Sequence, residues 1–251
     1  MSLPSPTQTG RIALVTGASR GIGRACALGL AKAGAQVVAC ARSKAGLEDL
    51  DDEIFAATGQ HATLIPFDIT EGDACDRLSA ALLDRFGRID TFVHCAAILG
   101  QLSPVTHHDP KDFDKIVAVN LTATWRLIRA LEPLLRLSAA GRAVFLTTGT
   151  AATRGRAFWG PYGATKAAME SLVRAWADEI EITPIRAAIV SPGAMRTKMR
   201  ASAFPGEDPM SLPHPDAFVP LMLELADPTR QPPLDTVDFR EWQAAHSQQI
   251  A

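Results

Sequence analysis

Short apolar runs alternate with longer amphipathic stretches through the first 200 residues of the chain. Six runs rich in Val, Ile, Ala and Leu predict buried strands at residues 11–17, 35–42, 62–68, 89–97, 141–148 and 184–193. The stretches between them predict helices near 21–33, 44–58, 72–86, 111–137 and 162–181. Apolar strands separated by helices are typical of a parallel sheet that is covered on both faces. The pattern therefore predicts an α/β fold with a doubly wound parallel sheet.

The chain is predicted to form one domain. Its 251 residues suffice for one substantial core, and neither an internal repeat nor a linker divides the first 200 residues. Residues 1–10 are expected to be a mobile tail, so that the domain spans residues 11–251. The late prolines gather in residues 203–233 and predict a loop-rich excursion with a short helix near 216–226. Residues 235–239 are predicted to return as a last, short strand.

Composition narrows the function classes. The net charge is −2, so no basic field points to nucleic acid or to an anionic membrane. No apolar run approaches the roughly eighteen residues that a membrane-spanning helix needs. The four cysteines include no C-x-x-C pair and the six histidines are dispersed, so no metal site is predicted. Scattered reduced thiols indicate a cytoplasmic protein.

A glycine-rich turn follows the first predicted strand. The strand Ile12 to Thr16 leads into Gly17, Gly21 and Gly23 and then into an amphipathic helix. Glycines in this position let the backbone turn tightly and approach a pyrophosphate, which the free N–H groups of the helix N-terminus attract. Glycine-rich turns also occur for packing alone, but the strand before and the helix after favour phosphate binding. This turn predicts a Rossmann-like dinucleotide fold.

A tyrosine and a lysine stand four residues apart in "YGATK". On a helix, the side chains of Tyr162 and Lys166 would share one face. A lysine cation beside a phenol favours the phenolate, so the pair can deliver a proton near neutral pH. Proton delivery to a substrate oxygen is helped by a second donor that holds this oxygen. The hydroxyls just upstream all belong to threonines: Thr147, Thr148, Thr150 and Thr153.

The glycine spacing and the Y-x-x-x-K pair together resemble the short-chain dehydrogenase/reductase family. The resemblance covers roughly residues 10 to 200 and rests on "TGASRGIG", "FDIT", "VHCAA", "VNLTA", "YGATK" and "SPGAMRT" in the expected order. It points to the single-domain type of roughly 250 residues. The resemblance implies an NAD(P)-dependent oxidoreductase that interconverts a carbonyl and an alcohol by hydride transfer.

The resemblance also implies roles for the catalytic residues. Tyr162 would exchange a proton with the substrate oxygen, and Lys166 would lower the pKa of this tyrosine and hold the nicotinamide ribose. Asn120, in "VNLTA", would anchor a water molecule that continues the proton path.

The family's serine, thirteen residues before the tyrosine, is replaced here by Gly149. A small shift in the loop would let Thr148 or Thr150 supply the hydroxyl, with Thr148 preferred because it is nearer to the strand end. Alternatively, the enzyme works without this donor, or it has lost catalysis and keeps only dinucleotide binding. Losing one such donor typically costs on the order of 10²–10³ in rate, out of a total enhancement of at least about 10⁶. An active enzyme is therefore preferred over a protein that only binds the dinucleotide as a sensor or interaction partner.

The second predicted strand indicates which cofactor is used. NAD-preferring members of the family carry an acid where this chain has Ala41, and Arg42 follows it. With Arg20, this favours NADP(H) over NAD(H), because a 2′-phosphate needs charge-assisted donors. Cys95 and Ala97 depart from the family's usual loop after the fourth strand. By resemblance, the cofactor contacts are Gly17, Ser19, Arg20, Gly21, Ile22, Gly23, Arg42, Asp68, Ile69, Ala96, Tyr162, Lys166, Pro192, Gly193 and Thr197.

The substrate is expected to be a small-molecule carbonyl or alcohol. Residues 195–233 are the expected substrate-loop region, and the expected pocket residues are Gly149, Thr150, Trp159, Met195 and Met199. Phe204 could extend this apolar wall, with Arg196, Lys198 and Arg200 as a basic rim. The predicted helices at 111–137 and 162–181 would form the subunit contacts of a homodimer or homotetramer.

Overall fold

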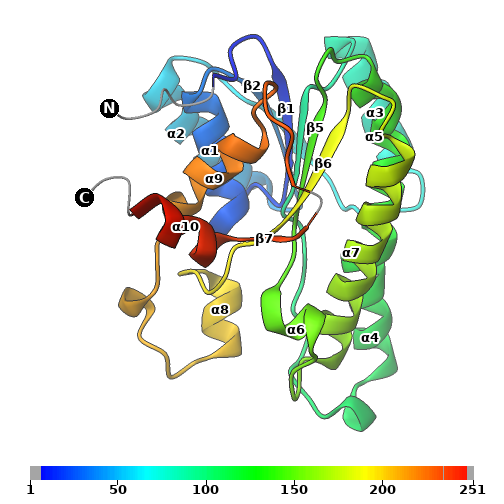
Figure 1. The fold of residues 1–251 in the computed structure, drawn as a ribbon, viewed down its shortest axis with the longest axis vertical. Coiled ribbons are helices and arrows are strands. Elements are labelled where there is room, and N and C mark those ends of the chain that lie inside the picture. The colour runs from blue at the N-terminus through cyan, green and yellow to red at the C-terminus, as the bar shows by residue number, and fades with distance from the viewer. Residues whose placement is uncertain (1–6, 234, 248–251) are drawn as a thin grey trace.

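The computed structural model describes residues 7–233 and 235–247, without the side chains of Thr150 and Ser247. Seven parallel strands form one sheet in the order β3-β2-β1-β4-β5-β6-β7 (Figure 1). The strands are β1 (Ile12–Thr16), β2 (Gln36–Ala41), β3 (Thr63–Pro66), β4 (Thr91–His94), β5 (Arg142–Leu146), β6 (Arg186–Ser191) and β7 (Val237–Asp238). The strand order reverses between β1 and β4, and the carboxyl ends of strands at such a point are where open α/β sheets bind ligands.

Helices cover both faces of the sheet (Figure 1). One layer contains α1 (Gly21–Lys32), α2 (Lys44–Thr58), α9 (Val219–Leu225) and α10 (Phe239–Ser247). The other contains α3 (Ala74–Phe86), α4 (Pro110–Val117), α5 (Ala123–Arg136) and α7 (Gly160–Glu179). The short helices α6 (Gly149–Thr153) and α8 (Lys198–Ala203) lie beyond the carboxyl ends of the strands. The predicted doubly wound α/β fold is confirmed.

Side chains along each strand point alternately to the two faces of the sheet, so the hydrophobic core has two layers. Ala13 and Val15 of β1 pack with Leu30 of α1, whereas Leu14 between them packs with Leu127 of α5 on the opposite face. Successive side chains of a strand point to opposite faces, so an apolar run without polar gaps fills both layers. Truncating a fully buried leucine such as Leu14 to alanine would cost about 2–5 kcal/mol.

The helix predicted at 111–137 is divided. A π-helical turn, η2 (Ala118–Thr122), joins α4 to α5 and contains Asn120. Single π-turns inside helices are frequent at functional sites, and periodicity did not predict this one. The short helix expected near 216–226 is α9, preceded by the 3₁₀ turn η4 (Pro215–Phe218). Two further 3₁₀ turns are η1 (Val105–His107) and η3 (Pro209–Ser211).

The mobile tail expected over residues 1–10 is wrong for its described part, residues 7–10. Gln8 is fully buried, and its Nε2 donates to the Ala226 carbonyl at 3.1 Å. Its backbone N–H donates to the Ala33 carbonyl at 2.8 Å. A polar side chain whose groups are all satisfied can be buried, which an apolar pattern does not reveal. Residues 1–6 lie outside the described part of the chain.

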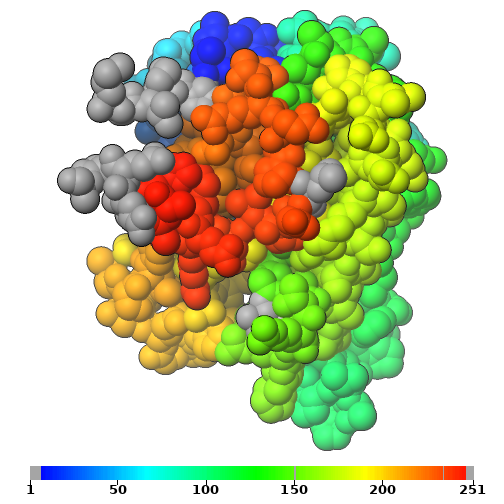
Figure 2. All heavy atoms as spheres, in the orientation of Figure 1, coloured from blue at the N-terminus to red at the C-terminus, as the bar shows by residue number. Residues whose placement is uncertain are grey.

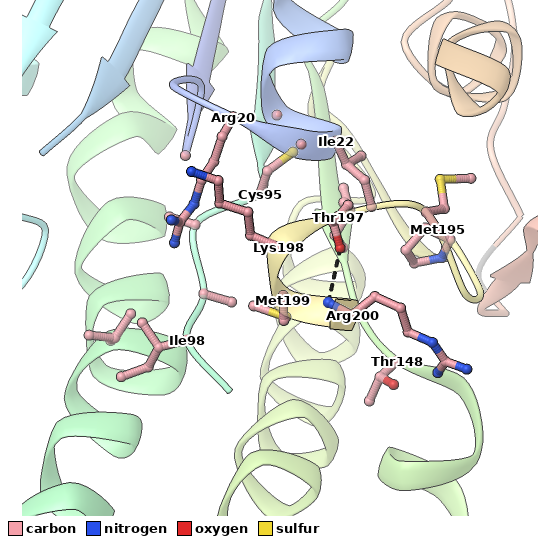
Figure 3. Close-up of a pocket in the computed structure, with 18 of the residues that line it drawn as sticks. Arg20, Ile22, Cys95, Ile98, Thr148, Met195, Thr197, Lys198, Met199 and Arg200 are labelled. Atoms are coloured by element: carbon pink, nitrogen blue, oxygen red, sulfur yellow. Dashed lines mark hydrogen bonds between the residues drawn. The ribbon is translucent and has the colours of Figure 1, made fainter. Parts of the chain in front are cut away.

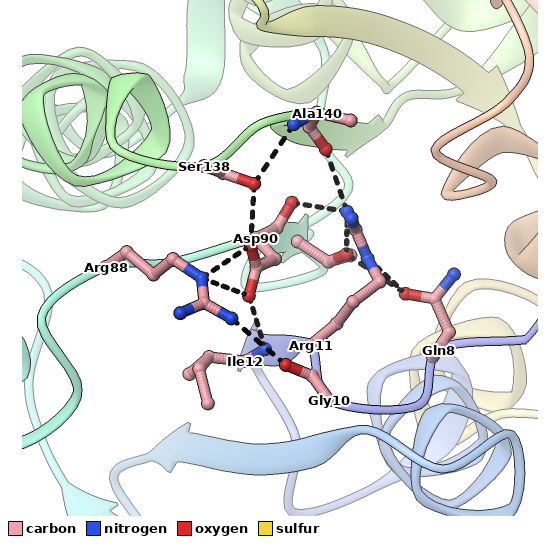
Figure 4. A network of polar contacts seen from close by, with 9 residues as sticks. Gln8, Gly10, Arg11, Ile12, Arg88, Asp90, Ser138 and Ala140 are labelled. Carbon is pink, nitrogen blue, oxygen red and sulfur yellow. Dashed lines mark hydrogen bonds and ion pairs between the residues drawn. The ribbon is translucent and has the colours of Figure 1, made fainter.

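A polar network around Asp90 fastens the ends of the strands opposite the site (Figure 4). The Asp90 carboxylate accepts from the Ile12 N–H at 2.8 Å, the Ser138 hydroxyl at 2.6 Å and the Arg88 guanidinium at 3.0 Å. Burial alone would raise the pKa of Asp90, but these hydrogen bonds outweigh it and the pKa lies below its usual value. The network ties β1 to the segment that leads into β4.

Two absences hold for the described residues. No helix among them has both the length and the hydropathy needed to cross a bilayer. Nor do three or more of their His, Cys, Asp or Glu side chains gather in a way that would hold a metal ion.

Candidate active site

A cleft of about 980 Å³ opens at the carboxyl ends of the strands. It runs from the turn between β1 and α1, past the end of β4, to α6, α7 and α8. Figure 2 shows a hollow on this side, between the α8 segment in yellow and orange and the α6–α7 segment in green. The cleft lies at the point where the strand order reverses, as expected for a ligand site of this architecture.

The glycine turn forms one end of the cleft. A Cβ on Gly17, whose φ is +69°, would lie 2.9 Å from the Ala96 backbone nitrogen, and one on Gly23 would collide with the Gly17 carbonyl. Neither position tolerates a side chain. Helix α1 begins here with no side-chain cap on its first N–H groups and no acid in its first turn. A close-packed backbone with free N–H groups fits a pyrophosphate.

Cations surround this end of the cleft. Arg20 and Lys198 reach from opposite sides toward the same part of the cleft (Figure 3). Arg42, directly after β2, lines the cleft as well. The residue before it is the buried Ala41. An acidic side chain at this position would repel a phosphate. This charge pattern suits an anion at the end of β2.

Asp68 keeps one carboxylate oxygen available. Its Oδ1 accepts from both the backbone N–H and the hydroxyl of Thr70, at 2.9 and 2.7 Å. These two hydrogen bonds hold the pKa of Asp68 below its usual value. No hydrogen bond within the described residues uses Oδ2. Ile69 beside it is buried and lines the cleft, so an amino group on a flat ring could be held here.

Tyr162 and Lys166 lie on one face of α7, both buried and both lining the cleft. Lys166 Nζ donates to the Leu146 carbonyl at the end of β5, at 2.8 Å. Burial lowers the pKa of Lys166 to about 8 and raises the pKa of Tyr162 to about 12. The expectation that Lys166 lowers the pKa of Tyr162 is therefore not met in this structure. Burial disfavours the charged phenolate, and the Lys166 ammonium group is hydrogen-bonded to the Leu146 carbonyl.

Asn120 holds the loop after β4. Its Oδ1 accepts from the Ile98 N–H at 2.9 Å, and its Nδ2 donates to the Ile98 carbonyl at 2.9 Å and to Thr165 Oγ1 at 3.2 Å. Both amide protons are thus used, and the side chain is fully buried without lining the cleft. The side chain thereby fastens this loop to α7, and the water-anchoring role expected for Asn120 stays a prediction.

His94 links β1 to the π-turn. Its Nδ1 lies 2.8 Å from Thr16 Oγ1, and its Nε2 lies 3.0 Å from Thr124 Oγ1. Thr124 donates its own hydroxyl proton to the Asn120 carbonyl at 3.0 Å. The hydrogen bond between His94 and Thr124 therefore needs a proton on His94 Nε2, which donates to Thr124 Oγ1. Burial, followed by the charge of Lys166, lowers the pKa of His94 to about 3. The ring is neutral and structural, and no metal role follows.

The upstream threonines are not equivalent. Thr147 donates its hydroxyl to Glu170 at 2.6 Å in the interior, and Thr153 donates to the Gly149 carbonyl at 3.4 Å. Thr148 lines the cleft, and its hydroxyl has no partner among the described residues. The side chain of Thr150 lies outside the described part of the chain. Thr148 is thus the one described threonine of the four whose hydroxyl is free in the cleft.

Gly149 leaves room beside a further hydroxyl. A Cβ added to Gly149 would lie 3.4 Å from Ser191 Oγ, at ordinary van der Waals distance, and 4.0 Å from an oxygen of Asp238. Ser191 ends β6 and pairs with Asp238 of β7, and both line the cleft. The sequence analysis missed this pair, because only the parallel pairing of two distant strands brings it to Gly149.

Trp159, Met195 and Met199 line the end of the cleft between α7 and α8, whereas Phe204, which was expected to extend this wall, does not line the cleft. The rings of Trp159 and Tyr162 meet edge to face at 5.8 Å, and Phe204 lies 5.9 Å from Trp159. Met195 is buried and Met199 half-buried at the wall that α8 forms. Of the predicted basic rim, Arg200 pairs with Glu207 at 2.6 Å and Arg196 donates to backbone carbonyls.

The predicted positions converge well in space. All fifteen residues expected to contact the cofactor line the cleft, as do Gly149, Trp159, Met195 and Met199. The sequence analysis missed Arg156, Ser191, Asp238 and Arg240, which also line it. For Arg156 a signal existed, since it lies in "GRAFWGP" just before Tyr162.

Comparisons with known proteins show the family to which the chain belongs. The sequence profile described as short chain dehydrogenase matches residues 11–208. The Escherichia coli K12 protein named "Uncharacterized oxidoreductase YciK" is 38% identical over 217 residues, which cover 86% of this chain and 85% of that protein.

Two solved short-chain dehydrogenase structures are also similar. One, from Shigella flexneri 2a in complex with NADP, is 36% identical, with a TM-score of 0.89 over 94% of this chain and 99% of that one. The other, from Escherichia coli CFT073 in complex with NADPH, is 35% identical, with the same TM-score and coverages. The chain belongs to the short-chain dehydrogenase family and is an oxidoreductase that acts on CH–OH and C=O groups.

Proposed function

We propose that the protein is an NADP(H)-dependent oxidoreductase that interconverts a small-molecule carbonyl and its alcohol. One observation carries the cofactor preference: Arg42 directly after β2 and Arg20 in the turn before α1 both line the cleft, and Ala41 stands where an acid would favour NAD(H). A 2′-phosphate at this strand end would find charge-assisted donors and no acid at position 41. The NADP and NADPH complexes of the two similar dehydrogenases support the same preference.

The residues present fit the dinucleotide. The side-chain-free surface at Gly17 and Gly23 and the uncapped start of α1 would receive the pyrophosphate, with Lys198 near it. Asp68 Oδ2 and Ile69 would hold the adenine. Lys166 would exchange its bond to the Leu146 carbonyl for the ribose hydroxyls near the floor of the cleft. When bound, NADPH supplies the hydride to the carbonyl carbon.

Tyr162 supplies the proton in the reduction direction. Its phenol transfers a proton to the carbonyl oxygen as the C–H bond forms, so that the carbonyl becomes an alcohol and the phenol a phenolate. Once Lys166 has left the Leu146 carbonyl for the ribose, its ammonium would stabilise this phenolate. Thr148 would hold the carbonyl oxygen, since its free hydroxyl faces the cleft. Asn120 and His94 position the loop and the π-turn beneath these groups.

Assembly and compartment are part of the proposal. Helices α4 and α5 expose Phe113 and Trp125, at 44% and 48% of their surfaces. Helix α7 exposes the small residues Ala164, Ser171 and Ala175, which allow close helix packing. A homodimer or homotetramer built on these helices would cover both surfaces. All four cysteines are unpaired, which suits the cytoplasm.

A second candidate function is dinucleotide sensing without turnover, which Gly149 favours. The test is NADPH consumption over a panel of aldehydes, ketones and quinones, with Tyr162→Phe beside the wild type. Turnover that depends on Tyr162 supports the oxidoreductase. NADPH binding without turnover of any carbonyl in either protein would favour the sensor.

A further inference from the structure

A second cavity of about 480 Å³ adjoins the substrate end of the cleft. Its lining is mostly apolar and consists of Leu102, Arg156, Ala157, Phe158, Trp159, Ala203 and Phe204. Arg156, Trp159 and Ala203 also line the main cleft. The two spaces therefore adjoin at these three residues, so Arg156 stands between the cleft and the side cavity.

Arg156 is a cation held without a counter-ion between these two spaces. Its guanidinium carbon lies 5.3 Å from the ring centre of Trp159 and 5.0 Å from that of Phe204. It has no ion pair and its guanidinium no hydrogen bond within residues 7–233 and 235–247, whereas Arg200 nearby is bidentate to Glu207. Stacking leaves the guanidinium N–H groups free, so they are available to a planar anion.

Backbone hydrogen bonds brace the loop that carries Arg156. Phe158 has a φ of +72°, the left-handed region that bulky residues rarely adopt, and it is the one non-glycine residue with positive φ in the described part of the chain. Its carbonyl accepts from the Ser103 N–H at 3.2 Å, and the Trp159 N–H donates to the Arg156 carbonyl at 3.0 Å. These bonds fix the turn that presents the guanidinium.

We propose that the substrate is a carbonyl compound with an apolar body and a carboxylate, which pairs with Arg156. The apolar body would pack on Trp159 and Phe204, and the carbonyl would reach Tyr162. The inference rests on the proposed function and adds the substrate class. A carboxylate matches the planar fork of a guanidinium with two parallel hydrogen bonds, and the side cavity offers no acid that would repel it.

The expected preference for a substrate with a carboxylate over an uncharged one is moderate, because Arg156 is exposed to solvent. Exposed ion pairs favour the charged partner by up to about fivefold. This preference should fall as ionic strength rises, because salt screens exposed charges. A preference based on packing alone would not respond to salt.

The test compares 4-formylbenzoate with its methyl ester, which share a ring and a carbonyl but differ in charge. The ratio of kcat/KM for acid over ester is measured for the wild type, Arg156→Met and Arg154→Met. Methionine keeps an apolar stem on the aromatic rings. Arg154 is the matched control, since it is exposed in the same loop and lines neither cavity.

We expect a ratio of about five in the wild type and in Arg154→Met, and a ratio near one in Arg156→Met. An unchanged ratio in Arg156→Met would overturn the proposal, and so would a wild-type ratio near one with good turnover of the ester. Calorimetric binding of 4-(hydroxymethyl)benzoate and its methyl ester to the three proteins gives the same comparison without turnover. Failure of the reductase is thereby distinguished from failure of the Arg156 contact.

Discussion

The hydroxyl oxygen of Ser191 lies 3.4 Å from the point where Gly149 would carry a Cβ. The space left by the missing side chain therefore lies beside a second hydroxyl, from a different strand. Since 3.4 Å is an ordinary contact, a small side chain fits at position 149 without moving β6.

Replacing Gly149 by serine should consequently yield a folded enzyme with higher turnover. The added hydroxyl restores a donor beside the reacting oxygen, and one such donor is worth on the order of 10²–10³ in rate where none replaces it. Because Thr148 already supplies a hydroxyl in our proposal, we expect about a tenfold rise in kcat at most. Steady-state kinetics of Gly149→Ser and Gly149→Ala separate the effect of the hydroxyl from the effect of the added carbon atom. Equal kcat values in the two variants would refute a donor role for the hydroxyl.

Removal of the Thr148 hydroxyl should lower kcat by about 10²-fold, because it then leaves the substrate oxygen without its donor. Thr148→Ala is compared with Thr148→Ser, which keeps the hydroxyl, and with Ser191→Ala. A larger loss of kcat in Ser191→Ala than in Thr148→Ala would transfer the donor role to Ser191. Little loss in either would support a site that works without a side-chain donor.

Arg42→Asp should reverse the charge at the end of β2 and with it the cofactor preference. We expect the ratio of kcat/KM for NADPH over NADH to fall by about tenfold or more, because the new carboxylate repels a 2′-phosphate and accepts from ribose hydroxyls. The control is Lys44→Asp, an exposed residue that does not line the cleft. Equal ratios in Arg42→Asp and the wild type would remove Arg42 from the binding site.

Carbonyl reduction should decline above pH 8. Burial lowers the pKa of Lys166 to about 8, so the ammonium that stabilises the phenolate is present below this pH and is lost above it. Hence kcat/KM for reduction should be level below pH 8 and fall as the pH rises further. In Lys166→Arg the charge persists, because a guanidinium does not titrate there. A decline at the same pH in this variant, if it is active, would assign the titration to another group.

Asp90→Ala should destabilise the fold by about 3 kcal/mol at pH 7, since it leaves the Ile12 N–H and Ser138 without their buried acceptor. The pKa of Asp90 is lowered in the folded protein. Its stabilisation is therefore complete above the unfolded pKa of about 3.9 and is lost as the pH falls through the lower folded value. Urea unfolding of both proteins at pH 7 and below pH 4 measures this. A difference in stability that is independent of pH would show that the charge of Asp90 has no part in it.

Patterns along the chain were enough to predict the sheet, the glycine turn and the placement of Tyr162 and Lys166 on one helix face. Each depends on local pattern: apolar runs such as that of β1, glycine where a Cβ would collide at Gly17 and Gly23, and the helical spacing of Tyr162 and Lys166. These constraints act over a few residues, so they can be read along the chain.

Residues that are distant in sequence come together in one site only through packing between separate elements. Ser191 reaches Gly149 through strand pairing, and Arg156 meets Phe204 because α8 lies over the cleft. Asn120 is committed to the loop after β4, and burial, which no spacing reveals, sets the pKa of Tyr162. Such contacts and desolvation depend on packing between separate elements, and this packing is what a local sequence pattern does not contain.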